Sequence, residues 1–143
     1  MARYVTEIES ALPQGEAFAY MADFANARLW DPSVSEARRV GKAPVGLGSK
    51  FDLVARFGGR DVPLRYEIVE FDAPRRVVLE AKRAGFVSRD TITVEPTGNG
   101  SVVHYDATLT FGGVGRLFDP IMQRIFSRVG ARATLGIQTA MNS

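Results

Sequence analysis

The chain has 143 residues, of which 45% are hydrophobic and 24% are charged, with a formal net charge of +2. This composition is typical of one globular domain that buries its own core, and the scattered basic residues do not indicate a nucleic-acid partner. Because the sequence has no cysteine, disulfides, thiol catalysis and cysteine-based metal sites are excluded. No apolar run is long enough to span a membrane, and residues 1–8 lack a secretory hydrophobic region. We therefore expect a single cytoplasmic domain over residues 1–143.

The first segment is expected to contain one strand and two short helices. Residues 3–12 alternate between apolar and polar side chains and predict a strand that ends at Pro13. The apolar period then changes to three and four residues, which predicts two short helices between residues 14 and 30. Asp23 is expected to cap the second helix, since its carboxylate can accept from free amides of the next turn. Pro32 closes the helical region because the residue before a proline is disfavoured in a helix.

The segment from residue 34 to residue 111 is a succession of strand patterns separated by glycine, proline and asparagine turns. Six strands are predicted, at residues 35–41, 49–57, 61–71, 76–83, 86–95 and 101–111. Their connections are too short for parallel crossovers, which need about a dozen residues, so neighbouring strands pair antiparallel. Together with the first strand, this predicts a seven-stranded antiparallel sheet.

Alternation along these strands assigns two faces to the sheet. Apolar positions share one face, among them Phe51, Leu53, Ala55, Phe57, Leu64, Tyr66, Ile68, Val77, Leu79, Ala81, Ile92, Val94, Val103, Tyr105, Ala107, Leu109 and Phe111. Charged residues share the other face, as expected of an antiparallel sheet with one side in water. His104, the only histidine, shares parity with Asp106 on that wet face. We therefore expect neither a zinc site nor a Ser-His-Asp triad.

The last segment, residues 114–142, has no strand pattern and predicts a long amphipathic helix. Its apolar positions recur at steps of three and four residues: Val114, Leu117, Phe118, Ile121, Met122, Ile125, Phe126, Val129, Ala133, Ile137 and Ala140. Such a stripe needs an apolar partner, which the sheet supplies. Arg124, Arg128 and Arg132 form a strip that we expect to face water, with contact to anionic lipid or an acidic partner as the alternative.

Several short motifs lie in a fixed order along the whole chain. They are Pro13 with Ala17-Phe18, Asp23-Phe24, Trp30-Asp31-Pro32, Val45-Gly46-Leu47-Gly48-Ser49, residues 67–76 and Gly98-Asn99-Gly100-Ser101. In these motifs and in the order of its elements, the sequence resembles the helix-grip superfamily, also called START-like or SRPBCC, and within it the polyketide cyclase/dehydrase group. The resemblance implies an α+β fold: a seven-stranded curved antiparallel sheet wraps around the long C-terminal helix, with two short helices between strands 1 and 2. It also implies a cavity between the sheet and that helix.

Inward-facing side chains would line this cavity. The candidate ligand-binding residues are Trp30, Phe51, Leu53, Tyr66, Leu79, Asp90, Ile92, Tyr105, Phe118, Met122 and Phe126. Pockets for small molecules are mostly apolar, with a few placed polar groups. Tyr66 and Tyr105 can hydrogen-bond a carbonyl or a phenol, although a strand tyrosine more often packs its ring inside and leaves its hydroxyl at the rim. Trp30 is expected near the cavity mouth. The alternative for the aromatic and methionine positions is a packed core, which is the more common role of such a stripe at helical spacing.

Asp90 is the candidate catalytic residue. It shares parity with Ile92 and Val94 and is therefore expected to face the cavity. An apolar environment disfavours the charged form of a carboxyl group, raises its pKa and suits it to proton transfer. The alternatives are that Asp90 lies in water at the open end of its strand, pairs with an arginine, or is turned outward by a bulge.

Three functions fit these patterns. The first is a domain without metal or cofactor that binds a hydrophobic small molecule, such as a lipid, a polyketide or another aromatic compound. The second is an enzyme of the polyketide cyclase/dehydrase kind, in which cavity shape, exclusion of water and Asp90 or a tyrosine promote the reaction. The third is a protein-interaction module with a filled core. The oligomeric state stays open at this point.

Overall fold

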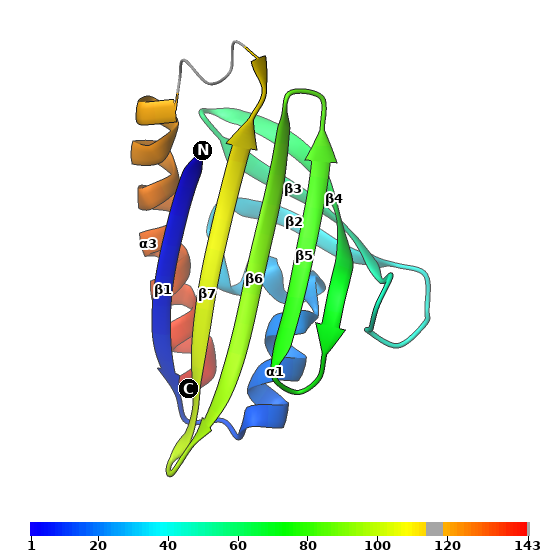
Figure 1. The fold of residues 1–143 in the computed structure, drawn as a ribbon, viewed down its shortest axis with the longest axis vertical. Helices are drawn as coiled ribbons and strands as arrows, with labels where there is room; N and C mark the ends of the chain where they lie inside the picture. Colours follow the sequence, from blue (N-terminus) through cyan, green and yellow to red (C-terminus); the bar gives the residue numbers. More distant parts are fainter. Residues whose placement is uncertain (114–118, 143) are drawn as a thin grey trace.

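The computed structural model describes residues 1–113 and 119–142 and confirms the predicted α+β helix-grip fold (Figure 1). One antiparallel sheet has the strand order β1-β7-β6-β5-β4-β3-β2. The strands are β1 (Ala2–Ser10), β2 (Val34–Val40), β3 (Lys50–Phe57), β4 (Arg60–Asp72), β5 (Arg76–Arg83), β6 (Phe86–Thr97) and β7 (Gly100–Phe111). The helices are α1 (Gln14–Ala22), the 3-10 turn η1 (Phe24–Asn26), α2 (Ala27–Trp30) and α3 (Asp119–Asn142).

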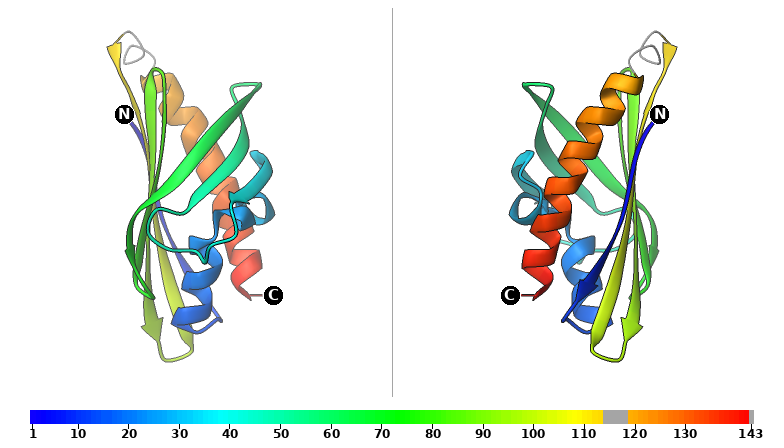
Figure 2. Two further views of the ribbon diagram at one scale, coloured as in Figure 1. Left: turned by 90° about the vertical axis from the view of Figure 1, so that its right-hand side faces the viewer. Right: turned by 90° about the vertical axis from the view of Figure 1, so that its left-hand side faces the viewer.

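The sheet is strongly curled, and its concave side holds all the helices (Figure 2). Helix α3 runs obliquely across that side and packs against β1 and α2. Helix α1 packs on β6 and β7, whereas η1 packs on β2 and β3. The long helix therefore covers only part of the apolar face, and the short helices cover another part.

The two faces of the sheet have the predicted composition. Inner-face residues such as Phe51, Ile68 and Ile92 have no exposed surface. On the outer face, Arg65 forms two hydrogen bonds of 2.7 and 2.9 Å with the carboxylate of Asp52. His104 also lies on that face, as predicted, with Nδ1 3.3 Å from a carboxylate oxygen of Glu7. Charge outside and hydrocarbon inside fix which face turns toward the helices.

Strands β1 and β4 show how the strands depart in detail from the sequence prediction. Strand β1 ends at Ser10 and not at residue 12, because the Leu12 amide donates to the Ser10 hydroxyl (3.0 Å) and turns the chain. Strand β4 has a register shift between Ile68 and Glu70. The extra residue restores Phe71 to the inner side, where its ring lies 5.5 Å from that of Phe18, and simple alternation does not anticipate it.

Helix α3 confirms the predicted amphipathic element over the residues that the structure describes. The predicted apolar positions Val114, Leu117 and Phe118 lie outside those residues. The expectation for Ile121 is wrong, since 59% of it is exposed. It lies about 100° around the helix axis from Met122, which faces the interior. The basic strip of Arg124, Arg128 and Arg132 is exposed.

Helix α3 sits close to the chain beneath it. The backbone of Gly136 lies so near the Trp30 carbonyl that a side chain at this position would collide with it, and Gly130 lies equally near the Tyr4 ring. The Tyr4 hydroxyl lies 3.1 Å from Thr134 Oγ1. Two helix glycines therefore set how closely α3 approaches β1 and α2. Within the described chain, none of the helices combines the length and apolarity needed to cross a membrane.

Candidate functional site: a cavity with a buried carboxyl group

A cavity of about 160 Å³ lies between the inner face of the curled sheet, the end of α2 and helix α3. Its walls are formed mainly by the side chains of aliphatic and aromatic residues. Helix α3 contributes Met122, Phe126, Val129, Gly130, Ala133, Thr134 and Ile137. The interior is therefore hollow on the side where the sheet turns away from α3, and the solid core required of an interaction module is not found there.

The size of the cavity limits what it can hold. Its volume of about 160 Å³ is below the range of roughly 300–1,000 Å³ found for most ligand pockets. It is similar to an engineered apolar cavity of about 150 Å³ that binds benzene. As it stands, the space suits a compound with about one ring, and a larger guest would require the walls to move.

Asp90 and Tyr105 form the polar centre of the cavity. Asp90 on β6 is paired with Ala107 on β7, and Tyr105 on β7 is paired with Ile92. This register makes Asp90 and Tyr105 diagonal neighbours on the inner face, a separation that a long side chain can bridge. The Tyr105 hydroxyl donates to Asp90 Oδ2 at 2.6 Å. Only 6% of Asp90 and 8% of Tyr105 are exposed. Asp90 therefore neither lies in water at the end of its strand nor pairs with an arginine, because its side-chain partner is Tyr105.

Burial raises the pKa of Asp90 to about 7. The hydrogen bond from Tyr105 opposes this effect because it stabilises the carboxylate, whereas the negative charges of Asp31 and Asp106 add to it. At neutral pH both forms of Asp90 are therefore populated. A carboxyl group with this property can accept or donate a proton under physiological conditions.

A second polar pair lies across the neighbouring strands. Tyr66 on β4 and Ser88 on β6 both pair with Ala81 on β5. Because alanine is small, the Tyr66 hydroxyl reaches over it to within 2.7 Å of Ser88 Oγ. Burial, followed by the charge of Asp90, raises the pKa of Tyr66 and of Tyr105 well above the usual value for tyrosine. Both phenols therefore stay protonated near neutral pH and act as hydrogen-bond partners.

Asp31 also lines the cavity, although it was not among the site residues predicted from the sequence. It follows the end of α2, and its Oδ1 accepts hydrogen bonds from the Ser33 amide (2.9 Å) and the Ser33 hydroxyl (2.7 Å). Burial raises the pKa of Asp31, and the two bonds from Ser33 oppose that rise. The Asp-Pro-Ser sequence identifies a turn, but it does not reveal that this turn closes one side of a cavity.

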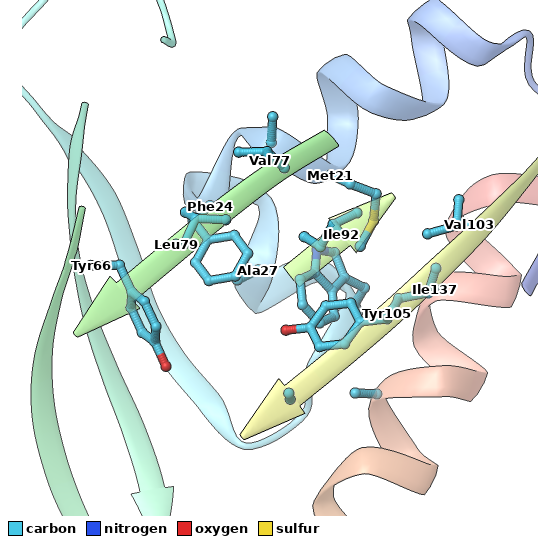
Figure 3. Packing of buried hydrophobic residues seen from close by; sticks show 14 of the residues in the cluster. Met21, Phe24, Ala27, Tyr66, Val77, Leu79, Ile92, Val103, Tyr105 and Ile137 are labelled. Atoms are coloured by element: carbon cyan, nitrogen blue, oxygen red, sulfur yellow. The ribbon is translucent and has the colours of Figure 1, made fainter. Parts of the chain in front are cut away.

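Aromatic rings form the wall around these polar groups. The Trp30 ring lies 5.6 Å from that of Tyr105 and 6.0 Å from that of Phe24, measured between centroids. Phe24 in turn lies 5.1 Å from Tyr66. Figure 3 shows Tyr66 and Tyr105 approaching from different parts of the curled sheet, with Phe24 between the strands and the helices. Trp30 is only 2% exposed, so it lies deep inside and not at the cavity mouth as expected.

The predicted ligand-binding residues fall into three groups in the structure. Those that line the cavity are Trp30, Leu53, Tyr66, Asp90, Tyr105, Met122 and Phe126. Phe51, Leu79 and Ile92 share the inner face but have no exposed surface and are not among the lining residues, so they belong to the core beneath it. Phe118 lies outside the residues that the structure describes. Alternation along the strands identifies the inner face of the sheet. It does not distinguish side chains that are packed in the core from those that line the cavity.

Comparison with solved structures shows which fold class this architecture defines. A START superfamily protein from Mycobacterium smegmatis matches with a TM-score of 0.80 and 9% identity, over 99% of this chain and 97% of the other. A protein from Thermus thermophilus matches with a TM-score of 0.76 and 19% identity, over 98% and 95%. Major latex-like protein 151 from Panax ginseng matches with a TM-score of 0.70 and 14% identity, over 98% and 97%. The chain therefore has the START-like fold.

The family follows from the sequence itself. The model of the family described as "polyketide cyclase / dehydrase and lipid transport" matches residues 1–141, and the chain belongs to this family. A search of curated protein sequences finds no match. The resemblance inferred from the short motifs is thus confirmed at the level of fold and family.

Proposed function

We propose that this protein binds a hydrophobic small molecule, such as a lipid, a polyketide or another aromatic compound, in the cavity beneath α3. The observation that carries the proposal is the cavity of about 160 Å³ with an apolar lining and a few inward polar groups. Apolar side chains that line a void forgo packing contacts, which stabilise a folded protein. A guest that fills the void restores those contacts and supplies a driving force for binding.

The candidate contacts are Trp30, Leu53, Tyr66, Asp90, Tyr105, Met122 and Phe126. Membership in a family described by lipid transport as well as cyclase activity supports the same conclusion. The ring of Trp30 and the hydroxyl groups of the two tyrosines offer apolar and polar contacts within one small space. Such a combination favours an aromatic guest with at least one polar substituent.

Native mass spectrometry of protein purified from its natural source tests this proposal. We expect a co-purifying small-molecule mass that is lost under gentle denaturation. The matched control is Ala133→Phe, which adds a ring to a helix residue that is 9% exposed and lines the cavity. The proposal predicts that the additional mass is absent from this variant. If the variant retains the same bound mass, the molecule binds elsewhere and the cavity is not its site.

An enzyme of the polyketide cyclase/dehydrase kind is the second candidate, because Asp90 has a pKa of about 7 and contacts Tyr105 inside the cavity. In that case the cavity would hold a reactive carbonyl compound in a productive conformation while Asp90 transfers a proton. The test is turnover of a poly-carbonyl substrate by the wild type and by Asp90→Asn. Loss of turnover with retained substrate binding supports catalysis by Asp90, whereas unchanged turnover removes Asp90 from the mechanism.

A further inference from the structure

The cavity lining has an unequal distribution of charge. Among the described residues that line it, the only carboxyl groups are those of Asp31 and Asp90, and none of these lining residues is a lysine, arginine or histidine. Helix α3 contributes hydrocarbon, a glycine backbone and the hydroxyl of Thr134, with no charge. A ligand carboxylate or phosphate would therefore meet carboxyl groups without a basic partner. In a buried site of low dielectric this repulsion is strongly unfavourable.

One oxygen of Asp90 remains free to receive a ligand. Its Oδ2 accepts the bond from Tyr105, and in the part of the chain that the structure describes no donor reaches Oδ1. Asp90 is only 6% exposed and lines the cavity, so a guest in the cavity lies next to this carboxyl group. A carboxylate oxygen without a donor is costly in such an environment, and a ligand that supplies one gains most where the donor is itself charged.

Aromatic rings line the same cavity as this oxygen. Trp30, Phe24, Tyr66 and Tyr105 form a connected series with centroid separations between 5.1 and 6.0 Å. The faces of such rings attract cations, with tryptophan the most effective. The aromatic rings and the acidic oxygen therefore both favour a ligand with a positive charge.

We infer that the cavity is specific for a hydrophobic aromatic amine in its protonated form, whose ammonium group donates to Asp90 Oδ1 while its ring packs against Trp30. This inference rests on the proposed binding function and narrows it from hydrophobic compounds in general to cationic ones. The volume of about 160 Å³ sets the size of the guest at about one ring with a short chain. Fatty acids and other anionic lipids are excluded from the site.

The test uses three ligands of matched shape and different charge: 2-phenylethylamine, 2-phenylethanol and 3-phenylpropionate. Isothermal titration calorimetry with the whole chain measures their dissociation constants. We expect the amine to bind about tenfold more tightly than the alcohol, since a charge-assisted hydrogen bond exceeds a neutral one by about 1.4 kcal/mol, which is tenfold. The acid is expected to bind most weakly of the three.

The pH dependence of binding is an independent test of the inferred specificity. The groups that face Asp90 are Tyr105 from β7, Tyr66 from β4 and Asp31 from the end of α2, and Asp106 acts on it through the sheet. Since both phenols stay protonated, Asp90 is the group expected to titrate near pH 7. Amine affinity should rise as the pH increases from about 6 to about 8, because Asp90 loses its proton. Alcohol affinity should stay nearly constant over that interval.

Two variants complete the experiment. Asp90→Asn removes the negative charge and should abolish the preference for the amine over the alcohol. The control is Asp106→Asn, which makes the same change on the opposite face of the sheet, where Asp106 pairs with Arg3 at 2.8 Å. It should retain the preference for the amine.

The outcomes distinguish a failure of the inferred specificity from a failure of the proposed binding function. If the alcohol or the acid binds as tightly as the amine, or if amine affinity does not rise with pH, the inferred specificity is wrong and the hydrophobic binding function stands. If none of the three ligands binds, both are overturned. Because the pH series uses the wild-type chain, the inference stays testable even where Asp90→Asn does not fold.

Discussion

The Tyr105 hydroxyl donates a hydrogen bond of 2.6 Å to Asp90 Oδ2 inside the cavity, on a sheet face that is otherwise mostly hydrocarbon. The bond exists because Asp90 lies opposite Ala107, whose small side chain leaves room for the diagonal approach of Tyr105. It partly stabilises a carboxylate that burial disfavours. The balance between burial and this bond leaves the pKa of Asp90 at about 7.

The first prediction is that the stability of the protein falls with rising pH because of Asp90. The pKa of Asp90 is about 3.8 when unfolded and about 7 when folded, so between these values the folded state holds a proton that the unfolded state has released. The free energy of unfolding therefore decreases as the pH rises from about 4 to about 7. The full effect at higher pH is about 4 kcal/mol, at roughly 1.4 kcal/mol per pKa unit.

Replacing Asp90 with asparagine should remove this dependence. Urea denaturation of Asp90→Asn at several pH values should give a flatter profile than the wild type and higher stability at pH 8. The control is Asp106→Asn, which should lose little stability, as expected for an exposed ion pair with Arg3. An Asp90→Asn profile parallel to that of the wild type would mean that Asp90 keeps an ordinary pKa in the folded protein.

The second prediction concerns Tyr105→Phe. The variant keeps the ring against Trp30 but removes the donor to Asp90, so the carboxylate loses its stabilising bond. The pKa of Asp90 should rise by about one further unit, since a hydrogen bond to a charged group contributes about 1.5–3 kcal/mol. Carbon-detected NMR of the Asp90 carboxyl across a pH titration measures this change. Tyr66→Phe, which loses its contact with Ser88, is the control and should shift the midpoint less.

The third prediction tests how α3 is held over the cavity. A side chain at Gly136 would collide with the backbone carbonyl of Trp30, which cannot move aside as a flexible side chain does. Gly136→Ala should therefore destabilise the protein by about 1–3 kcal/mol, although alanine is the better helix former. Gly15→Ala in α1, where the added methyl group meets open space, should instead stabilise by up to about 1 kcal/mol. Equal effects in thermal denaturation would show that α3 does not approach Trp30 this closely.

Most of the fold was predictable because it depends on short-range patterns in the sequence. Alternation placed Asp90 and Tyr105 on one face, and the glycine and proline turns predicted antiparallel pairing. The bulge between Ile68 and Glu70 was not predictable, because it depends on how β4 pairs with β5 and has no mark in the sequence. The end of β1 at Ser10 depends on a side-chain hydrogen bond that competes with strand pairing.

The site was less predictable than the fold. Parity alone grouped Leu79 with Tyr66, yet Leu79 is packed in the core while Tyr66 lines the cavity. Which inner-face residues border a void depends on how far the sheet curls away from α3, and that is a property of the whole sheet. Asp31 was missed for the same reason, since its turn meets the cavity only after α2 packs against α3.

The central claim is that the space beneath α3 admits a small aromatic guest, and Trp30 offers the most direct test because it is the only tryptophan in the chain and lines the cavity. The measurement is a titration of Trp30 fluorescence with 2-phenylethanol, in the wild type and in Ala133→Phe. We predict a saturable change in the wild type that is lost in Ala133→Phe while its circular dichroism stays native. The absence of saturation in the wild type, or identical saturation in a folded Ala133→Phe variant, would contradict the account.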